Sequence, residues 1–221
     1  MTEFPSPDNA AFEYLYELYH KNLSSFVSES ALEPEASPEA SSTPADKQYQ
    51  RAPQVPLADP DSAAVPGAIR RRASYREPER RPITDTELAT LLTYTYGEIR
   101  EVDGEPRRPV ASGGACYPLE LYPIVLDSPD IDAGIYHYNG RDGALDQLAA
   151  GDYSDWLQEQ WTWITSADTV AAAIVITALP GRSADRYGEM GYLLAALEAG
   201  AVIQNLQLLA TEFDIGSRPH N

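Results

Sequence analysis

The sequence has little of several residue types that common sites and partners require. Its one cysteine, Cys116, excludes an internal disulfide and indicates a reducing compartment. Only two of the 16 basic residues are lysines, Lys21 and Lys47. The 34 acidic residues give a net charge of −18, which argues against nucleic-acid binding, because that function needs a basic surface. The three histidines are scattered, and neither HExxH nor CxxC occurs, so we expect no metal site. A GxSxG elbow is also missing, which disfavours a serine hydrolase.

Signals for export and membrane insertion are missing as well. No basic start followed by an apolar core is present at the N-terminus, so we expect no signal peptide. The most apolar stretch, residues 190–210, contains Glu198 and several amides, which makes it too polar for a membrane span. We therefore expect a cytoplasmic protein. Abundant acid with scarce lysine is typical of halophilic proteins, whose carboxylates stay hydrated in salt; an ordinary acidic protein from a GC-rich genome is the alternative.

The chain divides by composition into three parts. Residues 8–26 place apolar side chains every three or four positions, which predicts an amphipathic helix within an N-terminal segment, 1–27. Residues 28–66 are rich in Pro, Ser and Glu and lack the hydrophobic residues that offset ordering entropy, so they predict a disordered linker. Residues 67–221 predict one ordered domain of sufficient size to bury a core.

Helix and strand patterns interleave within 67–221 and predict an α+β fold. Thr84 and Glu87 have the spacing of a capping box, which predicts a helix that ends at Gly97. The other patterns predict strands over 120–126 and 134–138, a turn at 139–140, a helix over 153–164, an inner strand buried on both faces over 170–179, and a long central helix over 187–213.

Alternate residues at the start of this domain favour anion binding. Arg72, Ser74 and Arg76 would point to one side of an extended segment. Two guanidinium groups and a hydroxyl that converge there would hold a phosphate through charge-assisted hydrogen bonds. A solvated basic run is the alternative, because further arginines are nearby, at positions 70, 71, 80 and 81.

A loop of small residues precedes the strand at 120–126. Ser112, Gly113 and Gly114 allow close approach of the backbone to a ligand, and their amides can donate to an anion or a ring edge. The alternative is a tight turn that feeds the strand. Neither GxGxxG nor GK[ST] occurs, so the loop is not a dinucleotide or Walker motif. Cys116, in an apolar run, is predicted to be a small buried thiol.

The order of these blocks resembles the nitroreductase superfamily and, within it, the SagB-type dehydrogenase branch. Residues 72–76, Arg-Ala-Ser-Tyr-Arg, resemble the Arg-x-Ser-x-Arg phosphate clamp of the family. Residues 112–122 resemble its Ser-Ala/Gly-Gly-Ala-x-Tyr-Pro-Leu-Glu-x-Tyr block, and residues 134–138 resemble the Gly-Leu-Tyr-His-Tyr strand that follows. Residues 198–206 are similar to its Glu-Ala-Gly-x-x-x-Gln-Asn-Leu helix.

The resemblance implies a homodimeric α+β oxidoreductase with FMN at the subunit interface and ping-pong hydride transfer through flavin N5. It assigns the phosphate to Arg72, Ser74 and Arg76, and the flavin lining to Ser112, Gly113 and Gly114. Gln204 and Asn205 lie in an apolar helix and are predicted to be buried amides, whose partner would be a flavin edge or a neighbouring backbone group. The electron donor is NAD(P)H or the substrate, a small molecule or a peptide; the branch typically oxidises azoline rings in ribosomal peptides to azoles.

Two departures from the family pattern affect the function. The Lys-Tyr pair with which the branch handles the substrate proton is Arg186-Tyr187 here. Arginine stays protonated, so Arg186 cannot act as a base, and Tyr187 is left as the candidate proton relay. The family also continues past its final helix into a glycine-rich loop and a last strand, whereas this sequence ends at Asn221. The alternative function is a flavin-free family member that acts as a scaffold or partner subunit.

Overall fold

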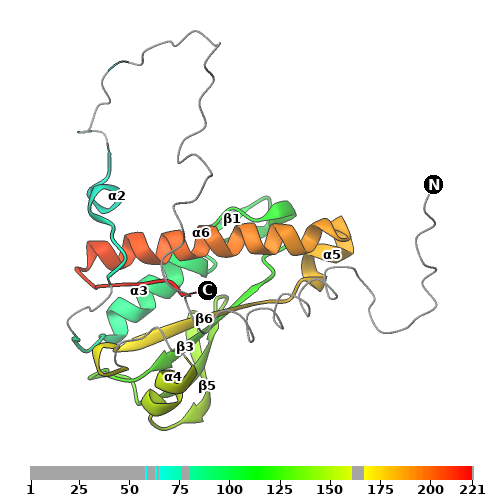
Figure 1. The fold of residues 1–221 in the computed structure, drawn as a ribbon. Coiled ribbons are helices and arrows are strands. Elements are labelled where there is room, and N and C mark those ends of the chain that lie inside the picture. Colours follow the sequence, from blue (N-terminus) through cyan, green and yellow to red (C-terminus); the bar gives the residue numbers. More distant parts are fainter. Residues whose placement is uncertain (1–57, 59–62, 64, 76–79, 161–166, 221) are drawn as a thin grey trace, which may run out of the picture. The chain divides into compact units, whose positions relative to one another are not determined.

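The computed structural model describes residues 58, 63, 65–75, 80–160 and 167–220 (Figure 1). The predicted helix over 8–26, nearly all of the predicted linker over 28–66, and Arg76 lie outside the described residues. So does the end of the predicted helix over 153–164. The chain divides into two compact units, of which Val65–Asn221 is the one described below.

An antiparallel sheet with the strand order β5-β4-β3-β6 forms the centre of this unit. Its strands are β3 (Leu119–Val125), β4 (Gly134–Asn139), β5 (Ala144–Ala150) and β6 (Ala172–Ala178). β3 pairs with β6 along its whole length, from Leu119 opposite Ala178 to Val125 opposite Ala172. The short strands β1 (Arg100–Val102) and β2 (Glu105–Arg107) form a separate hairpin.

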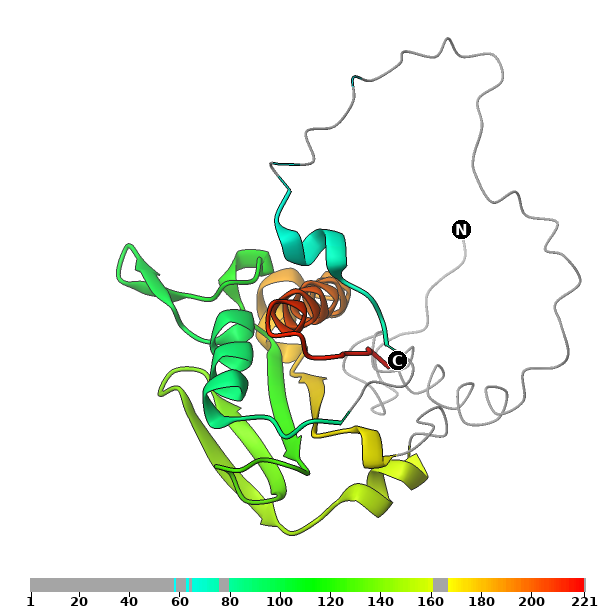
Figure 2. The same ribbon diagram turned by 90° about the vertical axis from the view of Figure 1, so that its left-hand side faces the viewer.

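Helices cover both faces of the sheet, as the view along α6 in Figure 2 shows. α3 (Asp85–Tyr96) and α6 (Met190–Glu212) lie on one face and share a core with the inward side chains of β3 and β4. α4 (Ser154–Gln160) packs on the other face, where Leu157 contacts Ile124 and Ala173. α2 (Gly67–Arg71) and α5 (Gly181–Tyr187) contact α6. The predicted α+β fold is confirmed.

The start of α3 confirms the predicted capping box. The Thr84 hydroxyl accepts the N–H of Glu87 at 3.2 Å, and the Glu87 carboxylate accepts the N–H of Thr84 at 3.1 Å. Arg81 donates two hydrogen bonds to Glu87, at 2.8 and 3.0 Å, and these lower the pKa of Glu87 to about 2. Gly97 ends the helix in an extended conformation, and a Cβ there would lie 2.7 Å from the Tyr138 hydroxyl.

The long helix predicted over 187–213 is confirmed as α6, except that it begins at Met190 instead of Tyr187 and is preceded by a separate short helix. α5 ends at Tyr187, Gly188 has a φ of 55°, and α6 begins at Met190. A left-handed φ is easily adopted by glycine and interrupts a helix, which explains the break. Gly191 lets the helices touch, since a Cβ there would lie 2.5 Å from the backbone nitrogen of Ala184.

α6 remains a central helix of about 35 Å. Its length and composition would allow it to cross a membrane. It packs instead against α3, α5 and β3, and Glu198 on it is buried, with 3% of its surface exposed. One side of α6 therefore contributes to the core of this unit, while its first half also exposes apolar side chains.

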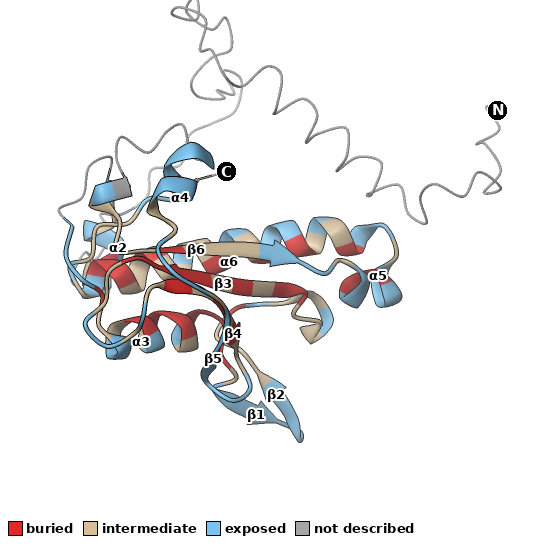
Figure 3. Cartoon of the chain, turned by 90° about the horizontal axis from the view of Figure 1, so that it is seen from below, coloured by how far each residue is buried: buried red, intermediate tan, exposed pale blue. Residues whose placement is uncertain are grey.

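The prediction of an inner strand over 170–179 is wrong, because β6 lies at the edge of the sheet. Ala173 is buried, but the rest of β6 is half-buried or exposed (Figure 3). The apolar sequence reflects the two faces that α6 and α4 partly cover, and it carries no information on how many strands pair with β6. The predicted turn after β4 is confirmed and leads into β5.

Candidate functional site

The loop from Ser112 to Tyr117 turns sharply before β3. Its backbone is left-handed at Gly114, Ala115 and Tyr117, with φ values of 61°, 54° and 45°. This conformation costs a residue other than glycine roughly 1–2 kcal/mol, so two such residues in one loop mark local strain. The Ser112 hydroxyl accepts the N–H of Tyr117 at 2.9 Å and holds the two ends of the loop together.

Arg186 and Tyr187, at the end of α5, lie against this loop. Arg186 Nη1 donates to the Gly114 carbonyl oxygen at 3.3 Å. The Tyr187 hydroxyl occupies the space that a Cβ at Gly114 would need. Tyr187 is 36% exposed, so part of the residue remains accessible to solvent. The structure therefore brings the predicted catalytic pair onto the predicted ring-lining loop.

A buried polar network underlies the loop and was missed by the sequence reasoning. Tyr96 on α3 donates its hydroxyl hydrogen to Glu198 Oε1 at 2.7 Å and accepts the N–H of Leu119 at 2.9 Å. Burial raises the pKa of Glu198, against the opposing effect of Ser112, Tyr96 and Arg108. The network thus connects α3, α6 and the start of β3. Nothing in the spacing of Tyr96 distinguishes it from a core aromatic residue.

Arg108, which follows the β1–β2 hairpin, contacts the loop through Tyr117. Its guanidinium carbon lies 4.3 Å from the centre of the Tyr96 ring and 5.2 Å from that of Tyr117, within cation–π range. The N–H of Arg108 donates to the Tyr117 hydroxyl at 3.2 Å. The side chain of Tyr117 is thereby held while its backbone stays left-handed.

The candidate phosphate-binding residues meet at the other end of α6. Arg72 Nη1 and Gln207 Nε2 each lie 3.4 Å from the Ser74 hydroxyl oxygen. Both distances exceed the usual 2.7–3.2 Å for N–H···O hydrogen bonds, so these donors are weakly engaged. A phosphate oxygen is a stronger acceptor than a hydroxyl, and the donors therefore fit a phosphate. Arg76 lies outside the described residues.

The neighbouring arginines differ from Arg72. Arg71 pairs with Glu212 and Asp214. Arg80 pairs with Asp127, and Arg81 with Glu87. Within the described part of the chain, Arg72 has no carboxylate at ion-pair distance. This difference favours an anion-binding role for Arg72 over a uniformly solvated basic run.

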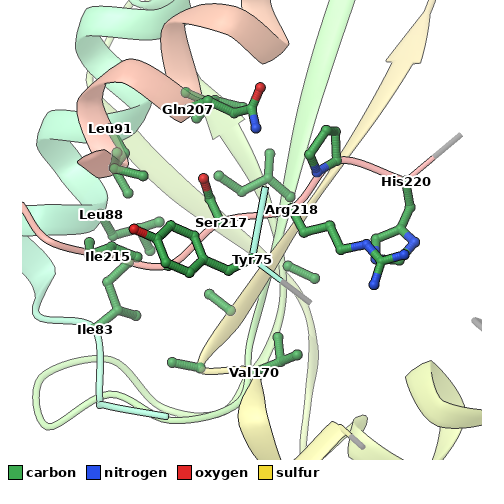
Figure 4. A pocket seen from close by; sticks show the side chains of 18 of the residues that line it. Tyr75, Ile83, Leu88, Leu91, Val170, Gln207, Ile215, Ser217, Arg218 and His220 are labelled. Atoms are coloured by element: carbon green, nitrogen blue, oxygen red, sulfur yellow. The ribbon is translucent and has the colours of Figure 1, made fainter. Parts of the chain in front are cut away.

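A cavity of about 770 Å³ opens beside this cluster, and Figure 4 shows Tyr75 and Gln207 among its lining residues. Its walls are β6, apolar side chains of α3 and α6, and the segment 214–220, whose Ser217 carbonyl accepts the N–H of Tyr75 at 3.1 Å. The lining is mostly apolar. Gln207 belongs to both the cavity wall and the Arg72–Ser74–Gln207 cluster, and Ser217, Arg218 and His220 add polar groups to the wall.

Three predicted burial states are corrected by the structure. Gln204 is exposed on α6, and Asn205 is half-buried, so neither is the fully buried amide that was expected. The buried amide is Gln207, which lies one helical turn after Gln204. Cys116 is half-buried, because the tight turn beside it leaves its sulfur, 3.9 Å from the Gly114 carbonyl oxygen, near the surface.

Comparisons with known proteins agree on one family. The sequence model of the nitroreductase family matches residues 69–220. MJ1384 of Methanocaldococcus jannaschii, named as a nitroreductase, is 27% identical over 74% of this chain and 81% of its own length. The microcin B17-processing protein McbC of Escherichia coli is 28% identical, over 52% of this chain and 44% of McbC. The trifolitoxin-processing protein TfxB of Rhizobium leguminosarum is 40% identical, over 28% of this chain and 18% of TfxB.

Solved structures support the same fold. A crystal structure from Anabaena variabilis, named as a nitroreductase, is 31% identical with a TM-score of 0.52, over 57% of this chain and 26% of that one. The Escherichia coli microcin synthetase McbBCD complex with truncated pro-MccB17 bound contains a chain with a TM-score of 0.60 at 20% identity. That match covers 90% of this chain and 79% of the other.

Proposed function

Since the chain belongs to the nitroreductase family and its SagB-type branch, we propose that it is an FMN-dependent oxidoreductase that works by ping-pong hydride transfer. Members of this family are oxidoreductases that generally bind flavin. The observation that carries the proposal is the meeting of Arg186 and Tyr187 with the Gly114 loop. Gly114 and Arg186 are 72 positions apart in the sequence but lie in contact. The loop and the end of α5 therefore form one surface, against which a flavin ring and a substrate could lie.

Two sets of residues would hold the cofactor. Arg72, Ser74 and Gln207 supply donors for the phosphate, together with Arg76 by its place in the motif. Ser112, Gly113 and Gly114 present a backbone that a flat ring can approach closely. A bound flavin supplies a two-electron acceptor and donor at its N5 position.

The chain's own residues then orient the substrate and move its proton. The Tyr187 hydroxyl can both donate and accept a hydrogen bond, so we assign it the proton relay. Arg186 stays charged, and its guanidinium lies 5.6 Å from the Tyr187 ring. We assign Arg186 the role of holding the loop and of stabilising negative charge on Tyr187 or on the substrate.

The positions of the two sets favour a homodimer. The loop contacts α6 at Leu194, through Gly113, and the phosphate residues contact α6 at Gln207, through Ser74. Leu194 and Gln207 are 13 residues apart, which is about 20 Å along the helix. The five-carbon ribityl chain of FMN is shorter than this distance. We therefore propose that the phosphate residues of one subunit and the loop of a second copy complete each site.

α6 offers a surface for the second copy. Met190, Leu193 and Leu197 are 55%, 51% and 64% exposed and recur at steps of three and four, followed by the open Gly200 and exposed Gln204. An apolar stripe of this spacing is typical of a helix that packs against another helix. Gln204 would then lie in the interface, near the shared site.

The relatives' names bear on the substrate. McbC and TfxB process the peptides microcin B17 and trifolitoxin. We propose a peptide substrate for this chain also, and the exposed Tyr187 is compatible with a large molecule that approaches from solvent. A flavin-free scaffold subunit is the second candidate, since Arg186 cannot act as a base and one structural relative belongs to a multisubunit complex.

The visible absorbance spectrum of the protein, purified in concentrated KCl, tests the proposal. We expect a flavin spectrum, and release of the chromophore should give FMN by mass. A homogeneous, folded protein that stays colourless and does not bind added FMN contradicts the enzyme and supports the scaffold. If FMN is bound, reduction by NAD(P)H distinguishes a nicotinamide-driven enzyme from one that its own substrate reduces.

A further inference from the structure

Arg182 joins α5 to both the sheet and the ring-lining loop. Its Nη2 lies 2.5 Å from Glu120 Oε1 on β3, and its Nη1 donates to the Tyr117 carbonyl oxygen at 3.2 Å. Arg186 follows four residues later and therefore lies on the same side of the helix. Arg182 thus contacts one end of the loop, at Tyr117, and Arg186 contacts its middle, at Gly114.

Glu120 is itself fixed from the opposite side. His137 Nε2 on β4 lies 2.8 Å from Glu120 Oε2, and His137 Nδ1 lies 3.4 Å from the Asp146 carboxylate on β5. Burial raises the pKa of Glu120, but the hydrogen bonds from His137 and Arg182 outweigh it and lower that pKa. Each Glu120 oxygen therefore has its own partner, and its side chain is only 18% exposed.

α5 depends on such contacts for its position. A helix of seven residues has little stability of its own. At its start, the N–H of Leu179 donates to the Pro118 carbonyl oxygen at 2.7 Å, and at its end Gly188 interrupts the chain before α6. Ser183 and Ala184 pack on Gly191 and fix the helix axis. The face with Arg182, Arg186 and Tyr187 is turned to the loop by the contacts of its side chains.

We propose that Glu120 and Arg182 are positioning residues, which hold α5 so that Arg186 and Tyr187 lie on Gly114. The placement of α5 is independent of any cofactor. Its effect on turnover rests on the proposed function, through the role of Tyr187. Neither Glu120 nor Arg182 has to touch the substrate for this role.

Hydrogen–deuterium exchange of the flavin-free protein tests the placement. Glu120→Gln keeps the shape of the side chain and removes its charge, and Arg182→Gln removes the other partner. We expect amides of residues 181–188 to exchange about tenfold faster in both variants, while those of α3 are unchanged. Asp146→Asn is the matched control, since it removes a carboxylate from the same cluster without touching Arg182. Unchanged exchange at 181–188, or faster exchange throughout the domain, overturns the proposal.

Kinetics of the FMN-loaded enzyme test the link to Tyr187. For NADH-driven reduction of a quinone, we expect Glu120→Gln to lower kcat about tenfold, with FMN affinity and KM nearly unchanged. In a Tyr187→Phe background the same substitution should cause no further loss. An equal loss in both backgrounds shows that Glu120 acts otherwise and overturns the link. If wild type binds no FMN, the proposed function fails while the exchange experiment still decides the placement.

Discussion

The Gly114 carbonyl oxygen accepts a hydrogen bond from Arg186 at 3.3 Å, and the Tyr187 hydroxyl fills the space beside the same glycine. Two separate features favour a glycine there. Its φ of 61° is left-handed, and a side chain would overlap Tyr187. The two effects can be separated by mutation, because another glycine of this chain also has a left-handed φ but has no side chain next to it.

Gly114→Ala should displace Tyr187. We expect it to cost about 1 kcal/mol of stability through the left-handed backbone and to lower turnover as far as Tyr187→Phe does. The stability loss stays small because Tyr187, 36% exposed, can rotate outward. Urea denaturation and kcat for NADH-driven quinone reduction measure the two effects.

Gly143→Ala is the control for Gly114→Ala. Gly143 has a φ of 62°, and no atom lies within 4 Å of a Cβ built on it. We expect the same loss of stability and unchanged turnover. Full turnover in Gly114→Ala would show that the position of Tyr187 does not matter for the reaction.

Arg72→Ala should weaken FMN binding without unfolding the protein. A hydrogen bond to a charged group is worth about 1.5–3 kcal/mol, so we expect a loss of roughly 10- to 150-fold in affinity. Quenching of flavin fluorescence in a titration measures it. Arg71→Ala is the matched neighbour, whose exposed ion pairs with Glu212 and Asp214 contribute little. Equal affinities in both variants would remove Arg72 from the phosphate site.

Leu197→Glu should dissociate the proposed dimer. Leu197 is 64% exposed on the apolar stripe of α6, and in the proposed dimer a carboxylate there would be buried against the apolar surface of the second copy. We expect light scattering to give the mass of one chain. Leu148→Glu, at a 57% exposed position on β5, should leave the mass of wild type unchanged. A wild-type protein that is already monomeric contradicts the dimer.

Glu198→Gln should change how stability depends on pH. The pKa of Glu198 is raised above its ordinary value of 4.5 in the folded protein. Between the pKa of the unfolded state and the higher pKa of the folded state, the folded protein therefore binds more protons than the unfolded protein. The contribution of Glu198 to stability therefore falls as pH rises through this window. Glutamine does not titrate, so it removes this pH dependence, and its side-chain oxygen can still accept the hydrogen bond from the Tyr96 hydroxyl. We expect the free energy of unfolding of the variant, relative to wild type, to increase from pH 4.5 upward.

Denaturation curves across this pH range measure the effect of Glu198→Gln. Glu105→Gln, on the exposed hairpin, makes the same change in charge away from the Tyr96 network. If the free energies of unfolding of variant and wild type differ by the same amount at every pH, the pKa of Glu198 is not raised by folding, which contradicts the prediction.

Local signals in the sequence predicted local structure well. The capping box at Thr84 and the turn after β4 depend on neighbouring residues, and both are confirmed. The motif blocks also predicted the nitroreductase family and its SagB-type branch correctly. The capping box and the turn are each encoded within a few residues, and the family is encoded in the order of short motif blocks; a single sequence displays both directly.

Relations between distant segments could not be predicted in the same way. The apolar pattern of β6 indicates its covered faces and not its place at the edge of the sheet. Tyr96 and Glu198 lie 102 positions apart, and their hydrogen bond exists because α3 and α6 share one face of the sheet. Gly188 lies within a stretch of apolar helix pattern, and a lone glycine is common there, so its left-handed φ was not evident.

The joint between α5 and α6 restricts how this protein can be altered by evolution or design. Gly188 sets the direction of the chain, and the closeness of Gly191 to the backbone of Ala184 leaves no room for a larger residue. The angle of the joint therefore cannot drift gradually through small substitutions. Under the proposed function, we expect changes in substrate preference to come from exchanged side chains on α5 and the opposing loop, which makes those few positions the targets of a mutant library.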